Sequence, residues 1–215
     1  MTLHIYGRHT SYNVQKVLWL MDELELPYQL TQTGGKHGGN DHPDFLAMNP
    51  TGKVPVLVDD NQSVWESSTI LRYLTNQYGE NQWQIEQAGE RSLYERWMDW
   101  SQSTFEPAFI GVFWGHYRTP PRRRNNEAIL DSVKKCESCL GLLSEQLSAK
   151  EFLLGPYLSL ADISVGVFLH RLYQIDLTID FPNNIQDWYS RLATRPAYRK
   201  WAMSDFTELE GRLDY

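Results

Sequence analysis

The feature that most constrains the fold is a change of hydrophobic period part way along the chain. Residues 1–78 alternate short β-branched runs with segments of helical apolar spacing, in the order strand, helix, strand, helix, strand, strand, helix. From about residue 87 only helical spacing remains. We therefore expect an α/β domain over residues 1–79, followed by an all-α helical bundle over residues 87–215.

Local patterns place the individual elements. Strands are expected at residues 2–6, 28–31, 54–58 and 63–65. Helices are expected at residues 13–26, 43–48, 66–78, 87–117 (interrupted only by Pro107), 126–147, 159–172, 185–193 and 196–203. Ser159 and Asp162 have the spacing of a capping box, with aspartate in place of the usual Glu or Gln.

Composition excludes several classes of function. A formal net charge of −7 lacks the basic footprint of a nucleic-acid-binding protein, so no nucleic-acid partner is expected. No signal peptide is recognisable, and no apolar run reaches the ~18 residues that a membrane span needs. The 2 cysteines form no disulfide framework, which favours a cytoplasmic location.

Those cysteines, Cys136 and Cys139, lie within the helix expected at residues 126–147. One CxxC without a histidine cluster is a weak zinc signal, so no metal is expected. Two structural cysteines on one helix face are the better interpretation.

Three short motifs in the first domain carry the chemistry. Ser11 and Asn13 lie where a helix begins, and a helix N-terminus favours an anion. A hydroxyl or amide there can donate to a thiolate and lower the thiol pKa from its usual value near ~8.5. Each residue type is also an ordinary helix cap, so this motif alone is weak.

The other two motifs suit a peptide-like ligand. Pro55 begins a strand, and a cis-proline there would leave the backbone of Val54 free to pair with an extended peptide. Ser67 opens a helix whose N-terminus can hold a carboxylate, while Glu66 can accept from an ammonium group. Taken singly, these patterns are also typical of a plain turn and a charge-capped helix.

The combination resembles the glutathione transferase superfamily over essentially the whole chain. The resemblance implies a thioredoxin-like first domain, a helical second domain, glutathione as co-substrate and a homodimer. It places Ser11 at the catalytic hydroxyl position, and Asn13 at an asparagine that some bacterial classes use beside or instead of that hydroxyl. The residues that it assigns to glutathione are Lys36, His37, Lys53, Val54, Pro55, Glu66 and Ser67.

The resemblance also implies a site for a small, mostly hydrophobic electrophile between the domains. Aromatic residues on the long helix, Phe113, Trp114 and Tyr117, are the candidates for it, with His116 and Arg118 as polar groups at its rim. Several of these rings are expected to be core residues.

Two alternative functions stay open. Ser11 stands where one class of the family has cysteine, and relatives with a Ser or Thr plus Asn reduce disulfides or peroxides with glutathione supplying both sulfur atoms. A non-catalytic binding module is the other alternative, since fold alone does not establish function.

Overall fold

Four short apolar segments pair into one mixed sheet at the N-terminal end of the chain. The computed structural model describes residues 3–214, so residue 2 of the expected first strand lies outside the described residues. The sheet has the order β2-β1-β3-β4, with β1 and β2 parallel and the other neighbours antiparallel. Its strands are β1 (Leu3–Tyr6), β2 (Tyr28–Thr31), β3 (Val56–Asp59) and β4 (Gln62–Trp65).

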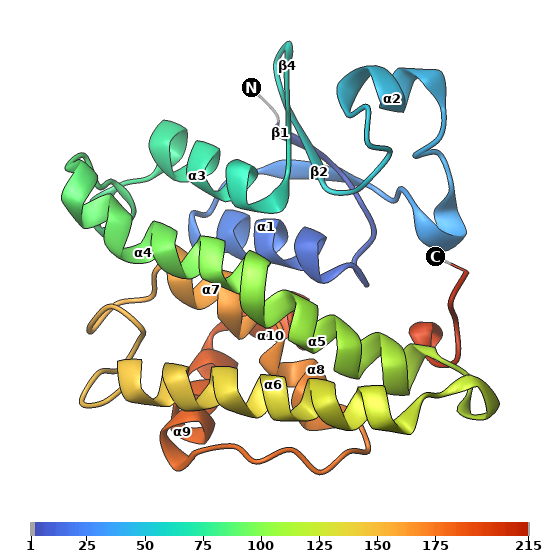
Figure 1. Ribbon diagram of the computed structural model, residues 1–215. Helices are drawn as coiled ribbons and strands as arrows, with labels where there is room; N and C mark the ends of the chain where they lie inside the picture. Colours follow the sequence, from blue (N-terminus) through green and yellow to red (C-terminus); the bar gives the residue numbers. More distant parts are fainter. Residues whose placement is uncertain (1–2, 215) are drawn as a thin grey trace.

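Helices make up the rest, and together with the sheet they confirm the expected fold class (Figure 1). Those of the N-terminal part are α1 (Tyr12–Glu23), α2 (Pro43–Met48) and α3 (Ser67–Tyr78). The C-terminal part contains α4 (Ala88–Trp100), α5 (Glu106–Val112), α6 (Asn126–Gln146), α7 (Leu160–Gly166), α8 (Leu169–Gln174), α9 (Asn183–Thr194) and α10 (Pro196–Trp201).

Two predicted helices are divided further than the sequence indicated. Wider π-helical turns at Ser101–Phe105 and Phe113–Arg118 flank α5. The first lies just before Pro107, the predicted interruption, which has no N–H with which to continue the regular ladder. The helix predicted at residues 159–172 breaks between α7 and α8. There the hydroxyl of Tyr198 donates to the carbonyl of Gly166 at 2.9 Å, an acceptor that a continuous helix would use itself.

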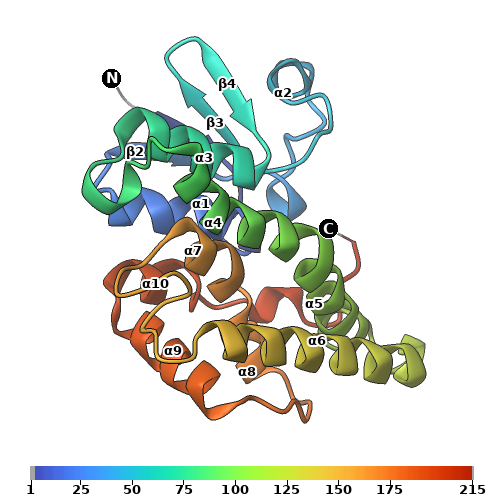
Figure 2. The same ribbon diagram turned by 60° about the vertical axis from the view of Figure 1, so that its left-hand side comes forward.

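Helix α1 lies between the sheet and the helical layer, as both views show (Figures 1 and 2). Its residues 14–21 are all buried, and it packs against α3 on one side and α7 and α10 on the other. The ring of Trp19 meets that of Tyr198 with centroids 4.8 Å apart. One apolar core therefore runs through both layers and holds the start of α1 at their boundary.

The C-terminal end of α1 carries two acids, although a helix C-terminus favours cations. Cationic side chains from the end of the chain offset them. Lys200 donates to Asp22 at 2.8 Å, and Arg195 forms an ion pair with Glu23. These contacts bind the far end of α1 to α10.

The predicted capping box is present at the start of α7. Asp162 is fully buried and accepts from the backbone and hydroxyl of Ser159, at 2.9 and 2.7 Å, from Leu153 N at 2.9 Å and from Trp188 Nε1 at 3.2 Å. Burial raises the pKa of this carboxyl to about 6, although the hydrogen bonds favour its ionised form. One carboxylate thus joins three segments of the helical layer.

Among residues 3–214, no helix is both long and apolar enough to traverse a bilayer.

We predict that Asp162→Asn lowers the free energy of unfolding by about 2–4 kcal/mol. The amide NH₂ group of asparagine can only donate, so it would face buried donors that now bind a carboxylate oxygen, and each unpaired buried donor costs about 1–3 kcal/mol. Urea denaturation measures this change. Asp131→Asn, at an exposed position of α6, is the matched control. Equal midpoints for the two variants would contradict the structural role assigned to Asp162.

Candidate functional site

A polar cavity of about 240 Å³ opens where α1, the segment before β3, α3 and α5 meet. It contains most of the residues that the sequence assigned to glutathione. Its described lining residues are Asn13, Asn49, Lys53, Val54, Pro55, Glu66 and Ser67 from the first part of the chain, and Gln102 and Glu106 from the helical part. We call it the larger cavity, in contrast to a second, smaller one beside the start of α1.

The segment before β3 is held in shape by a buried asparagine that the sequence analysis did not single out. The amide nitrogen of Asn49 donates to the carbonyl of Lys53 at 2.8 Å, and its oxygen accepts from the backbone of Thr51 at 3.0 Å. The Val54–Pro55 bond is cis, as expected. Val54 and Pro55 precede β3 instead of belonging to it, because proline has no N–H for the ladder.

Glu66 has an unusual backbone conformation at the start of α3. Its φ of 69° and ψ of 118° are sparsely populated by residues other than glycine, at a cost of about 1–3 kcal/mol. Such outliers concentrate at binding sites, where the surrounding structure enforces them. The N–H groups of Ser67 and Ser68 follow it in the first turn of α3, where a helix leaves its donors without internal partners.

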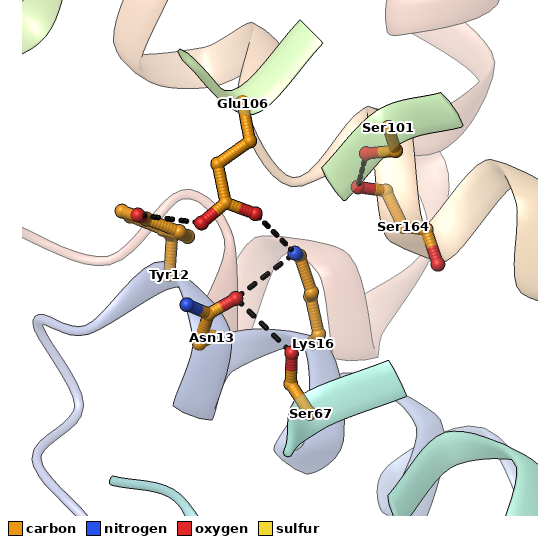
Figure 3. Close-up of polar contacts among 7 residues, drawn as sticks. All are labelled: Tyr12, Asn13, Lys16, Ser67, Ser101, Glu106 and Ser164. Atoms are coloured by element: carbon orange, nitrogen blue, oxygen red, sulfur yellow. Dashed lines mark hydrogen bonds and ion pairs between the residues drawn. The ribbon is translucent and has the colours of Figure 1, made fainter. Parts of the chain in front are cut away.

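Asn13, in the first turn of α1, is oriented by two donors (Figure 3). Its side-chain oxygen accepts from Lys16 Nζ at 2.9 Å and from Ser67 Oγ at 3.1 Å. The amide nitrogen lies on the opposite side of the group, and Figure 3 draws no contact from it. Since an amide NH₂ group can only donate, Asn13 offers a donor to whatever occupies the neighbouring space.

Lys16 belongs to a buried polar network that joins the two layers (Figure 3). It contacts Glu106 of α5 at 3.4 Å, and Tyr12 Oη donates to the other oxygen of Glu106 at 2.9 Å. Burial lowers the pKa of Lys16, which the charge of Glu106 opposes. Burial and Glu106 together raise the pKa of Tyr12, so this phenol stays protonated.

The sequence analysis missed both charged members of this network. Lys16 interrupts the apolar run of α1 three residues after Asn13, on the same helix face, which was an available signal. Nothing local pointed to Glu106, because its partners are distant in the sequence.

A smaller cavity of about 120 Å³ adjoins the start of α1 on the side of the helical layer. Ser11 lines this cavity, whereas Asn13 lines both cavities. Ser11 is the N-cap of α1, but its hydroxyl caps no described backbone group. The remaining described lining residues are Arg8, Thr10, Tyr12, Phe113, Trp114, Arg118, Arg171 and Leu209.

The aromatic residues expected at the second-substrate site are divided between two places. Phe113 and Trp114 line the smaller cavity with Arg118. Tyr117 stacks on Phe113 with ring centroids 5.3 Å apart and lines a separate cavity beside His170. The wide turn at Phe113–Arg118 spaces these residues differently from a regular helix.

Lys36 and His37 lie in an exposed short turn and do not line the larger cavity. Lys36 instead forms an ion pair with Glu208 near the C-terminal end. In this arrangement the glycine-rich loop is joined to the end of the chain, and its cation is already paired.

The cysteines of α6 are distant from this chemistry. Cys136 and Cys139 are both buried and free, and burial raises the pKa of Cys136 to about 12. Within residues 3–214 no group of three or more His, Cys, Asp or Glu residues could hold a metal ion.

Comparisons with known proteins agree with the family that the sequence motifs suggest. The N-terminal domain model of the glutathione S-transferases matches residues 5–82, and the C-terminal domain model matches residues 126–209. Glutathione S-transferase GstB of Escherichia coli K12 is 41% identical over 93% of this chain and 97% of its own length. Glutathione S-transferase 4 of Zea mays is 27% identical over 92% and 91% of the two chains.

A solved structure supports the same assignment. The theta class glutathione S-transferase of Xanthomonas axonopodis pv. citri, crystallised with glutathione bound, superposes with a TM-score of 0.88 at 36% identity, over 95% of this chain and 98% of that one. Sequence motifs, fold and relatives therefore agree, and the chain belongs to the glutathione S-transferase family.

Proposed function

We propose that this protein is a glutathione transferase that activates the glutathione thiol with the amide nitrogen of Asn13. The observation that carries the proposal is the position of Asn13, which lines both cavities and whose oxygen is occupied by Lys16 and Ser67. A thiolate held there would stand between the glutathione site and the space for a second substrate.

Glutathione would occupy the larger cavity in an extended conformation. The N–H groups at the start of α3, including that of Ser67, suit the γ-glutamyl carboxylate, and Glu66 suits the ammonium group beside it. Val54 and Lys53 line the same cavity; Val54 would offer its backbone to the cysteinyl unit, and Lys53 would meet the glycyl carboxylate.

Thiol activation would combine a hydrogen bond with a helix terminus. The thiolate is the charged form, so a donor from Asn13 and the positive end of α1 both favour it and lower the thiol pKa. The thiol proton leaves to solvent as the thiolate forms. The thiolate then attacks an electrophilic carbon, and as the carbon–sulfur bond forms a leaving group departs with its bonding electrons or, in a conjugate addition, the displaced π electrons take up a proton from solvent. Ser11, which lines only the smaller cavity, faces the electrophile in this scheme.

Lys16 would act as a positioning residue. Its ammonium group holds the oxygen of Asn13 and so turns the amide nitrogen the other way. Glu106 keeps Lys16 in place, and the π-helical turn before α5 brings Glu106 into reach.

A cytoplasmic homodimer is part of the same proposal. The homodimer is supported by large apolar side chains exposed on β4 and α4, where Trp65 is 37% and Leu93 is 47% exposed.

We predict that Asn13→Ala raises the pKa of bound glutathione by about 1–2 units, because a hydrogen bond to a charged acceptor is worth about 1.5–3 kcal/mol and one pKa unit corresponds to about 1.4 kcal/mol. Ultraviolet absorbance of the thiolate as a function of pH measures the shift. Ser11→Ala is the matched comparison, with a smaller expected shift. A larger shift for Ser11→Ala would assign the activation to the serine hydroxyl instead.

A double-mutant cycle tests the role of Lys16. We predict that Lys16→Met raises the thiol pKa by about 0.5–1 unit when Asn13 is present and has little effect in the Asn13→Ala background, since coupled residues are not additive. Lys150→Met, at an exposed position, is the control. Equal shifts in both backgrounds would mean that Lys16 acts as a nearby charge and not through Asn13.

Glu66 provides a prediction with opposite effects on stability and binding. Glu66→Gly relieves the unfavourable φ and should raise the free energy of unfolding by about 1 kcal/mol. It should also weaken glutathione binding roughly tenfold through loss of the ammonium partner. Thermal unfolding without glutathione and calorimetric titration with it measure the two effects. Glu66→Gln, which keeps the backbone conformation, should weaken binding alone; a less stable glycine variant would contradict the conformational argument.

A further inference from the structure

The smaller cavity beside Ser11 is unexpectedly cationic for a site expected to take hydrophobic substrates. Arg8 comes from the loop after β1, Arg118 from the end of the wide turn after α5, and Arg171 from α8. No Asp or Glu is among the described residues that line it. The N-terminus of α1 faces the same space and adds its partial positive charge.

Arg171 is the most buried of the three, at 1% exposure. Its Nη2 donates to Thr10 O at 2.8 Å and to Gln15 Oε1 at 3.3 Å, both of which are uncharged acceptors. Its Nε has no partner within residues 3–214, and the ion pairs found there include none for Arg171. Burial, with the charges of Arg8 and Arg118, lowers the pKa of its guanidinium.

A buried cation without a counter-ion is costly, and a bound anion would offset that cost. Among the described residues, Asp214 interacts electrostatically with Arg118 but does not line the cavity, and Glu106 and Glu208 form no ion pair with Arg171. Glu106 accepts from Tyr12 and Lys16, and Glu208 accepts from Thr10 at 2.9 Å and pairs with Lys36. Both carboxylates are therefore engaged by other donors, and neither lines the smaller cavity.

The aromatic part of the lining suits a flat group. The guanidinium of Arg118 lies 3.8 Å from the ring centroid of Trp114, and its Nε donates to Arg212 O at 2.8 Å. The guanidinium of Arg171 lies 5.0 Å from the ring of Phe113. Planar guanidinium groups fixed in this way are suited to bidentate recognition of a carboxylate.

We propose that the electrophile of this enzyme carries a carboxylate, which Arg171, Arg118 and Arg8 hold in the smaller cavity. The reactive carbon then lies toward Asn13, where the two cavities meet. This inference rests on the proposed transferase function and replaces a neutral hydrophobic substrate by an anionic one. In an aromatic substitution the thiolate adds to the ring carbon that bears chlorine, the carbon–sulfur bond forms, and chloride departs with the electrons of the carbon–chlorine bond.

A pair of substrates that differ only in charge tests the proposal. One is a chloronitrobenzoate with chlorine para to the carboxylate and nitro ortho to the chlorine, and the other is the corresponding benzamide. Each kcat/KM is divided by the rate constant of the uncatalysed reaction with glutathione, which removes their difference in intrinsic reactivity. The wild type should favour the carboxylate by about tenfold or more, the effect of a charge-assisted hydrogen bond.

Arginine variants then locate the preference. Arg118→Gln and Arg8→Gln should each reduce the carboxylate-to-amide ratio severalfold, whereas Arg123→Gln, an equal charge change at an exposed position, should leave it unchanged. Arg171→Met should reduce the ratio most, and circular dichroism verifies that it folds. A wild type that treats both substrates alike would overturn the proposal. An equal loss on both substrates in the variants would overturn it too, since the arginines would then serve the thiolate or the fold.

Binding without turnover separates this inference from the proposed function. With S-methylglutathione in the larger cavity, calorimetric titration should show tighter binding of 3-nitrobenzoate than of 3-nitrobenzamide, and Arg118→Gln should remove the difference. Equal binding of the two ligands would overturn the anion site, whatever the turnover. Failure of the transferase proposal would be seen in a different measurement: the ultraviolet absorbance of the thiolate would be missing with glutathione alone.

Discussion

The ion pair between the buried Lys16 and the partly buried Glu106 is the interaction on which the site depends. It joins α1 to α5, and so fixes the N-terminal layer against the helical layer where the cavities lie. Removing one member of such a pair leaves an uncompensated buried charge, at a typical cost of about 3–5 kcal/mol. Tyr12, Asn13 and Ser67 complete the network, so the same contacts that hold the layers together also orient the amide.

Much of the fold was readable from the sequence because it rests on local patterns. The change from mixed to purely helical periodicity predicted the two layers, and the Ser159–Asp162 spacing predicted the capping box. The interruption at Pro107 was predicted, but the wide turn at Phe113–Arg118 and the break before α8 were not. The break before α8 involves the hydroxyl of Tyr198, which comes from another helix and is distant in the sequence.

The site was predictable to the extent that its residues lie in short motifs. Asn13, Val54, Pro55, Glu66 and Ser67 converge on one cavity as expected from those motifs. Residues outside these motifs lie elsewhere: Lys36 and His37, on the glycine-rich loop, do not line the larger cavity, and Tyr117, at the end of the long helix, does not line the smaller one. Glu106 and Arg171 were invisible in the sequence, because burial and tertiary partners give them their roles.

The division of labour between the two halves of the chain has an evolutionary consequence. Most of the described residues of the larger cavity come from the N-terminal α/β part, whereas two of the three arginines of the smaller cavity, Arg118 and Arg171, come from the helical part. Substitutions in the helical part can therefore alter substrate preference without changing most of the residues proposed to bind glutathione. Among the described lining residues only Asn13 belongs to both cavities, so the two binding spaces can change independently except at this one position.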